Sequence, residues 1–203
     1  MSRHLLTPLF ALVVPAISLM GLATTNGCHP KAAQETAAGP AAGQQTEPAP
    51  TPPANWSTYT DPAYGFSIGY PDGFVVRQQD VAKLARFTPT PLVSIFFMNP
   101  TMAAGELAGV EPPDLEARVY RADAADSLKT WLVSVGFASS DSISTAKPFR
   151  NASVSGLEVC HSTMIAPGCS VFVLRSGRIY QLTAISKEGE AMIRTFVLRP
   201  TGS

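Results

Sequence analysis

The chain of 203 residues carries 15 lysines and arginines against 15 aspartates and glutamates, so its formal net charge at pH 7 is zero. This balance excludes the basic field that nucleic-acid binding requires, and neither end carries a run of like charge. Once an apolar leader and a low-complexity stretch are set aside, about 150 residues remain, which is the size of one domain with a single core.

The first 27 residues have the features of a signal peptide. Arg3 supplies a positive charge, and an apolar stretch from Leu5 to Ala23 follows and ends in small residues. Pro8 and Pro15 interrupt this stretch, and no run of stop-transfer charges follows it, so we do not expect a membrane-spanning helix. We expect the leader to be removed.

The sequence Thr25-Asn-Gly-Cys28 resembles the lipobox of bacterial lipoproteins, in which a small residue precedes the cysteine that is diacylated and becomes the mature N-terminus. Gly27 matches, whereas Thr25 stands where leucine is usual. The resemblance implies that Cys28 carries acyl chains such as palmitate, which at about 0.8 kcal/mol per buried methylene give stable membrane anchoring. The alternative is ordinary cleavage near Ala23 or Ala33, which would leave Cys28 as a stray thiol.

Residues 28–54 predict a disordered tether. The stretch is almost entirely Ala, Gly, Gln, Thr, Glu and Pro, with no large apolar side chain to form a core. As a flexible coil it would span roughly 25–30 Å. We therefore expect a globular domain over 55–203 that is held near the membrane but is free to tumble.

The start of this domain predicts a hairpin. Aromatic and aliphatic residues alternate between Trp56 and Tyr70 and indicate two short strands, and Pro71-Asp72-Gly73 places each residue where a turn favours it. The next expected segments are one or two helical turns over Gln79–Phe87, a buried strand over Leu92–Met98 and a loop over Met102–Pro113.

A strand over Leu115–Arg121 and a helix over Ala124–Val135 are expected next. Asp123 is a candidate N-cap, and Gly136 is a helix stop. Apolar residues recur at the i, i+3, i+4, i+7 spacing of one helix face, which we interpret as core packing and not as a cofactor contact; they are Leu128, Trp131, Leu132 and Val135.

The C-terminal part predicts a three-stranded meander followed by a helix. The expected strands are Leu157–Ile165, Ser170–Arg175 and Arg178–Ser186, and the expected helix is Glu188–Leu198. A two-residue turn at Ser176-Gly177 would place Val173 opposite Tyr180 and Val171 opposite Leu182. Both strand faces are apolar, so we expect an α+β fold in which an antiparallel sheet is flanked by helices.

The string from Tyr59 to Pro71 resembles the opening hairpin of the PsbP-like proteins, named for an extrinsic subunit of photosystem II. Gly177–Thr183 and a final helix containing a Phe also look like this family, while Phe74 stands where a Trp often follows the turn. The resemblance covers most of Trp56–Leu198 and implies an α/β/α sandwich. The family includes bacterial envelope lipoproteins and a Ran-binding nuclear factor, and its members share mostly binding; no ligand residues transfer to this sequence.

Cys160 and Cys169 remain as a pair if Cys28 is acylated, and an oxidising compartment favours a disulfide between them. A tight turn at Ala166–Gly168 would keep them roughly 13 Å apart, so the bond requires a wider loop in which 161–168 bulges out. The alternative is two small buried residues that never touch.

No motif predicts catalysis, a metal or a cofactor. His161 and Ser162 are strand neighbours that point to opposite faces, and no Gly-x-Ser-x-Gly elbow is present. A zinc site would require Cys160, Cys169, His161 and a carboxylate to converge, which we do not expect. Two glycosylation sequons, at Asn55 and Asn151, are expected to be idle in a bacterial protein.

The sequence thus favours a non-enzymatic binding or accessory domain, presented to an envelope partner from the extracytoplasmic side of a bacterial membrane. The alternative is an envelope lipoprotein that binds a small ligand or lipid for transport or stress response, and a hydrolase is a third hypothesis. A deep apolar pocket would favour the ligand binder, a flat apolar patch the partner-binding module, and converging titratable groups the enzyme.

Overall fold

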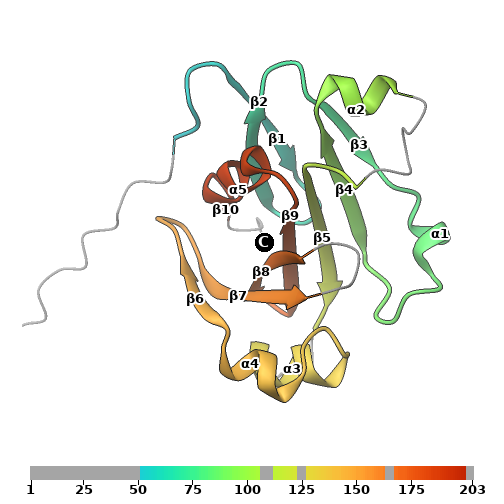
Figure 1. The fold of residues 1–203 in the computed structure, drawn as a ribbon, viewed down its shortest axis with the longest axis vertical. Coiled ribbons are helices and arrows are strands. Elements are labelled where there is room, and N and C mark those ends of the chain that lie inside the picture. The colour runs from blue at the N-terminus through green and yellow to red at the C-terminus, as the bar shows by residue number, and fades with distance from the viewer. Residues whose placement is uncertain (1–50, 106–111, 123–126, 163–166, 200–203) are drawn as a thin grey trace, which may run out of the picture. The chain divides into compact units, whose positions relative to one another are not determined.

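A computed structural model describes residues 51–105, 112–122, 127–162 and 167–199 of the chain, without the side chains of 161, 162 and 167 (Figure 1). In chain order the elements are β1 (Trp56–Asp61), β2 (Phe66–Pro71), β3 (Val75–Gln78), α1 (Val81–Leu84), β4 (Val93–Met98), α2 (Pro100–Ala104), β5 (Leu115–Arg121), α3 (Leu128–Ser134), α4 (Ser140–Ser144), β6 (Lys147–Arg150), β7 (Ser155–Ser162), β8 (Pro167–Arg175), β9 (Arg178–Ala184), α5 (Lys187–Arg194) and β10 (Val197–Leu198).

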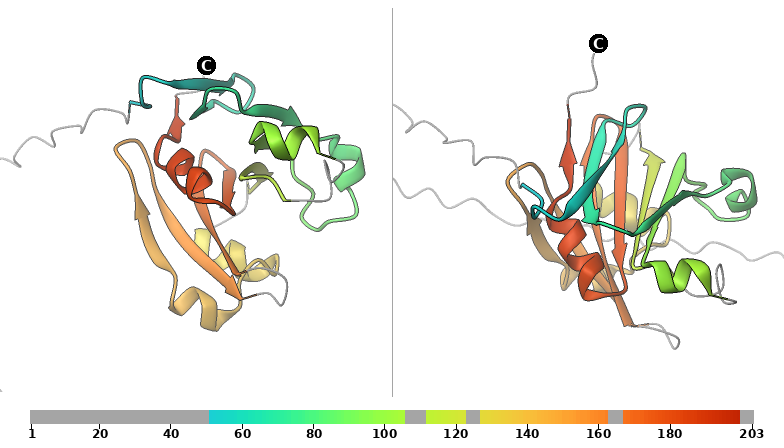
Figure 2. Two further views of the ribbon diagram at one scale, coloured as in Figure 1. Left: turned by 45° about the horizontal axis from the view of Figure 1, so that its top comes forward. Right: turned by 90° about the horizontal axis from the view of Figure 1, so that it is seen from above.

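The strands form two antiparallel sheets. The larger has seven strands in the order β3-β4-β5-β9-β8-β7-β6, and the smaller has three in the order β1-β2-β10. Figure 2 shows the small sheet and α5 on one side of the large sheet, with α3 and α4 at the opposite side. The α+β fold and the antiparallel sheet predicted from the sequence are confirmed.

The side of the large sheet that faces α5 and the small sheet carries the larger apolar cluster, here called the large core. Phe66 of β2, Phe97 of β4 and Phe196 after α5 are at most 1% exposed within it. Alternate residues of the same strands point to the other side. Val171 and Val173 of β8 belong to the large core.

The opposite side carries the small core, in which Trp131 and Leu132 of α3 meet Phe172 and Ile179 of the sheet. The central strands are therefore covered on both faces, as their sequence predicts. The predicted register at Ser176-Gly177 is also confirmed, since Val173 pairs with Tyr180 and Val171 with Leu182.

Helix α3 is shorter than the sequence predicts. It begins after Ser127, whose side chain accepts a hydrogen bond from the Thr130 amide at 3.1 Å, so Ser127 is the N-cap. Asp123, the predicted cap, lies outside the described residues. The predicted stop at Gly136 is confirmed by a φ of 76°, which glycine adopts readily.

The prediction that Met102–Pro113 is a loop is wrong at its start. Asn99 accepts a hydrogen bond from the Met102 amide at 2.9 Å and caps the short helix α2, with Pro100 in its first turn. Residues 106–111 lie outside the description. The helical turn expected over Gln79–Phe87 is confirmed as α1.

The prediction of one helix over Glu188–Leu198 is also wrong, because α5 ends at Arg194. Thr195 leaves the helical path: its hydroxyl donates to the Met192 carbonyl at 2.7 Å and accepts from the Gly69 amide at 2.8 Å. Phe196 then enters the large core, and Val197–Leu198 pair with β2 as β10. Tertiary contacts thus outweigh the helical periodicity here.

The motif Tyr64-Gly65-Phe66, on which the family resemblance rests, has a structural role in this chain. Gly65 has a φ of 68° in the turn between β1 and β2. The Tyr180 hydroxyl donates to the Tyr64 carbonyl at 2.8 Å, and Phe66 is 1% exposed. These contacts attach the small sheet to the large one.

Candidate functional site

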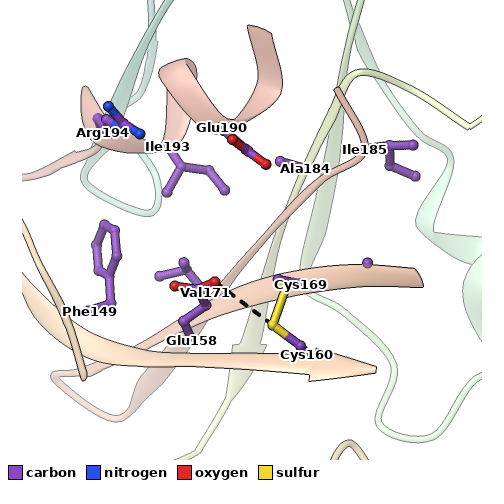
Figure 3. Close-up of a pocket in the computed structure, with 11 residues that line it drawn as sticks. Phe149, Glu158, Cys160, Cys169, Val171, Ala184, Ile185, Glu190, Ile193 and Arg194 are labelled. Atoms are coloured by element: carbon purple, nitrogen blue, oxygen red, sulfur yellow. Dashed lines mark hydrogen bonds between the residues drawn. A yellow bond between two sulfur atoms is a disulfide. The ribbon is translucent and has the colours of Figure 1, made fainter. Parts of the chain in front are cut away.

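A groove of about 410 Å³ lies between α5 and the sheet surface formed by β6 to β9, and is here called the α5 groove (Figure 3). It is open to solvent along one side. The residues that line it are Phe149, Glu158, Cys160, Gly168, Cys169, Val171, Ala184, Ile185, Glu190, Ile193 and Arg194.

The groove exists because the cover of the large-core face ends before the sheet does. Helix α5 packs on β9, β5 and β2, while the large sheet continues past β9 to β8, β7 and β6. Close packing fixes the helix, since a Cβ at Gly189 would lie 2.0 Å from the Asp114 carbonyl oxygen. The right-handed twist of a large sheet turns its outer strands away from such a helix, which leaves a hollow between them.

Asn151 joins the turn between β6 and β7 to the segment after α5. Its amide nitrogen donates to the Phe196 carbonyl at 2.8 Å, and its side-chain oxygen accepts from the Ser153 and Val154 amides, each at 2.9 Å. The turn between β6 and β7 is thereby tied to the end of α5. The second sequon is thus a structural asparagine whose side chain is already engaged.

The floor of the groove is apolar and its rim is charged. Val171 and Ile193 are buried members of the large core that reach the surface at this point. Glu158 on β7 and Glu190 on α5 direct their carboxylates into the space between the two elements, and Arg194 lies further along α5 (Figure 3). Ile185 stands at the mouth and is 50% exposed.

The structure contains the predicted disulfide between Cys160 and Cys169, which stand directly opposite each other on β7 and β8 with their Cα atoms 4.0 Å apart. The wide bulge over 161–168 is wrong, because His161 pairs with Gly168 and Ser162 with Pro167. The ladder continues past the cysteines as far as Ser162 and Pro167, and this register places Cys160 opposite Cys169.

The carboxylate beside the disulfide was missed by the sequence analysis. Glu158, Cys160 and Cys169 present oxygen and sulfur atoms that all lie within 4.8 Å of one another. The alternation of a strand puts residues 158 and 160 on one face, which is the available signal, but the cross-strand register was needed to add Cys169. The side chains of His161 and Ser162 lie outside the described residues.

A second polar cluster lies on the small-core side of the large sheet. The Ser94 hydroxyl donates to Glu116 at 2.9 Å, and Glu116 forms an ion pair with Arg118 at 2.5 Å. The Tyr120 hydroxyl donates to Gln181 at 2.9 Å, and burial of this hydroxyl raises the pKa of Tyr120 above its usual value. These polar groups form hydrogen bonds with one another, so we assign the cluster a structural role.

The acidic residues of the first hairpin also have structural partners. The Asp61 carboxylate is buried and accepts from the Tyr64 amide at 3.0 Å and the Tyr59 hydroxyl at 3.3 Å. Burial, the charge of Asp61 and this hydrogen bond raise the pKa of Tyr59 to about 12. Asp72 accepts from Ser57 at 2.7 Å, which agrees with its predicted place in a turn.

Cys28 and the rest of the predicted leader lie outside the described residues. Of the helices that the structure describes, none has the length and apolar character needed to cross a membrane.

No family model and no curated protein matches the sequence. A crystal structure of a protein from Bacteroides thetaiotaomicron is similar over 73% of this chain, with 13% identity and a TM-score of 0.45; the chain spans half the length of that protein. The solution structure of PsbP from the cyanobacterium Synechocystis sp. PCC 6803 is similar over 72% of this chain and 94% of its own, with 12% identity and a TM-score of 0.43. The second protein carries the family name that the sequence resemblance indicates, and neither similarity bears on what this chain binds.

Proposed function

We propose that the chain is a bacterial envelope lipoprotein, anchored through an acylated Cys28, whose domain is a non-enzymatic binding module. Its α5 groove binds a segment of an envelope protein that presents an apolar side chain next to a lysine or arginine. The observation that carries this proposal is the pairing of an apolar floor with two glutamates, Glu158 and Glu190, on opposite walls of one open groove.

Charge complementarity supports a basic partner. A cation that enters between two carboxylates from different elements gains from both, and partial shielding from water strengthens each interaction relative to an exposed ion pair. Arg194 lies further along α5 and would oppose a cation there, so it favours one orientation of the bound segment. The groove thereby selects both the charge and the direction of its partner.

The size and shape of the groove support a protein segment. A volume of about 410 Å³ holds a few side chains, and the open side lets an extended chain pass through. The exposed Ile185 at the mouth adds apolar surface for contact. The groove is neither a deep apolar pocket nor a flat patch, and an open, half-charged groove suits a peptide better than a lipid tail.

The chemistry of the groove supports binding over catalysis. Among its described lining residues, the titratable side chains are Glu158, Glu190 and Arg194, since the two cysteines are joined in a disulfide. Acyl transfer would require a nucleophile next to a base, and a disulfide sulfur does not serve as that nucleophile.

A small amphipathic ligand with a cationic group is the second candidate, because the groove volume also lies in the range of small-molecule sites. Such a ligand would use the same floor and the same glutamates. The two candidates differ in what a probe at the groove mouth would capture.

Site-specific photocrosslinking in the native membranes distinguishes them. A photoreactive phenylalanine analogue at Ile185, at the groove mouth, is compared with the same analogue at Val133, which is 40% exposed on α3. We expect position 185 to capture a protein through a peptide with a basic residue beside an apolar one, and position 133 to capture none. Capture of a lipid or small molecule, or equal capture at both positions, contradicts the proposal.

Mass spectrometry of the mature protein tests the anchor. We expect the N-terminal residue to be Cys28 bearing acyl chains, and Cys28→Ala to leave the leader uncleaved. A free N-terminus upstream or downstream of Cys28 contradicts the anchor without affecting the groove.

A further inference from the structure

We propose that the Cys160–Cys169 bond is reversible and that its reduced form, together with Glu158, binds a zinc ion at the end of the α5 groove. This inference goes beyond the proposed function, because it adds a metal site and a redox state to a groove otherwise assigned to a partner segment. Zinc is the ion chosen because two thiolates and a carboxylate are ligands it prefers.

The backbone already holds the three ligands together. Glu158 and Cys160 lie two residues apart on β7 and share one face, and Cys169 stands opposite Cys160 on β8. Glu158 Oε1 is 3.8 Å from Cys160 Sγ, and all three ligand atoms lie within 4.8 Å of one another. No change in strand pairing is needed to bring them onto one ion.

Reduction would separate the sulfurs to a spacing that zinc accepts. With Zn–S bonds of about 2.3 Å and tetrahedral angles, two thiolates on one zinc ion sit about 3.8 Å apart. Directly opposite residues with Cα atoms 4.0 Å apart reach this spacing through side-chain rotation. A fourth position faces the open groove, where water completes the tetrahedron.

The disulfide is accessible to a reductant. Cys160 is exposed, and among the described residues no atom lies within 4 Å of a Cβ added at the nearby Gly168. Thiol–disulfide exchange requires such access, because a thiolate must reach one sulfur of the bond. The exposure of Cys160 supplies this access.

The chemistry is balanced by a dithiol reductant. Its two thiols supply two electrons and two protons, the S–S bond of the protein breaks to give two thiols, and the reductant itself becomes a disulfide. Zinc binding then forms two Zn–S bonds and one Zn–O bond and releases the two thiol protons to solvent. No other oxidant or reductant enters.

The ladder on both sides of the bond explains why the hairpin would survive reduction. Strands β7 and β8 pair from Leu157–Phe172 through Ser162–Pro167, and β8 pairs with β9 from Cys169 to Arg175. The register of the two cysteines is therefore fixed by the sheet, whether or not their sulfurs are joined.

The test uses the full chain with Cys28→Ser in detergent, so that only two cysteines remain, and Co²⁺ as the spectroscopic probe for zinc. After reduction with a phosphine, we expect one Co²⁺ per chain, a thiolate-to-cobalt charge-transfer band, and loss of that band on addition of Zn²⁺. The unreduced chain should give no band.

Two variants separate the proposed site from a simple dithiol. Glu158→Gln should weaken Co²⁺ binding by at least about tenfold, whereas Glu188→Gln, an exposed carboxylate elsewhere on α5, should leave it unchanged. Far-UV circular dichroism confirms that each chain is folded. Absence of the band in the reduced chain, unchanged affinity in Glu158→Gln, or one Co²⁺ shared by two chains would overturn the proposal.

Discussion

On the large-core face of the seven-stranded sheet, apolar side chains run from β4 to β8 and are covered by a second sheet and a helix, whereas the small-core face mixes apolar and polar groups. Its polar groups, such as Glu116 and Arg118, pair with one another along the strands. The first face is buried beneath the small sheet and α5, whereas the second is buried beneath α3 and has hydrogen-bonded polar side chains elsewhere.

This difference between the two faces of the large sheet indicates where a partner can bind. Polar groups that already satisfy each other gain little from a partner, because a new contact must replace an existing one. At the end of the large-core face, by contrast, the cover stops at α5 and leaves core residues such as Val171 and Ile193 at the floor of an open groove. The α5 groove is therefore the part of the large core that no element covers, and charged side chains surround it.

The largest expected effect breaks the large core itself. Phe66→Ala removes a ring that is 1% exposed and contacts Tyr59, Tyr180 and Phe196, so we expect a loss of about 3–5 kcal/mol in the free energy of unfolding. Phe137→Ala, the matched change at a half-buried ring of the small core, should cost less. Urea unfolding measures both, and equal losses would contradict the ranking of the two faces.

Removing the disulfide should have the next largest effect. Replacing Cys160 and Cys169 with Ser releases the loop constraint on the unfolded chain, which is worth about 2–3 kcal/mol in the loop-entropy model. The same measurement on the reduced wild-type chain in metal-free buffer should give a similar loss. A double variant as stable as the oxidised wild type would show that the bond adds nothing to the fold.

The free energy of unfolding should be sensitive to Asn151, which joins the β6–β7 turn to the segment after α5. Asn151→Ala leaves the Phe196 carbonyl and the amides of the following turn without their side-chain partner, so we expect a loss of about 1–3 kcal/mol. Asn55, the exposed asparagine of the other sequon, is the control, and Asn55→Ala should change stability by less than about 0.5 kcal/mol. Equal losses of stability at the two positions would show that the Asn151 hydrogen bonds do not stabilise the fold.

The smallest expected effect is on how the free energy of unfolding changes at alkaline pH. The folded pKa of Tyr59 is raised to about 12, above the value of about 10 in an unfolded chain, by burial and by Asp61. Its contribution is therefore fully present below pH 10 and is lost as the pH rises from 10 towards 12. Unfolding free energies across this window should fall less steeply in Tyr59→Phe, and an unchanged slope would contradict the assignment.

The sequence predicted the parts of the fold that depend on local periodicity. The β8–β9 turn, the apolar stripe of α3 and the two-sided burial of β8 follow from residues close together in the chain, such as Ser176 and Gly177. The end of α5 did not follow, because the Thr195 contact with Gly69 joins segments 126 residues apart. Weak short strands such as β6 likewise depend on their neighbour β7 and not on their own pattern.

The candidate site was less predictable than the fold. Cys160 and Cys169 could be paired by elimination, but the cross-strand register that places them opposite each other could not be predicted, because Pro167 and Gly168 favour a turn and lie in β8. The groove could not be predicted, because it depends on where α5 crosses the sheet, and this crossing is set by contacts such as that of Gly189 with Asp114. Glu158 and Glu190 lie on different elements, and only the fold brings them to one groove.

The most direct test of the central claim is charge reversal at both walls of the α5 groove. Glu158→Lys with Glu190→Lys is introduced into the full chain that carries the photoreactive residue at position 185, and the yield of the crosslinked partner is measured in native membranes. The expected result is a fall of at least about tenfold in yield, since two attractive charges become repulsive, while the thermal midpoint of the purified protein stays within a few degrees. An undiminished yield would contradict the claim that this groove binds a basic partner segment.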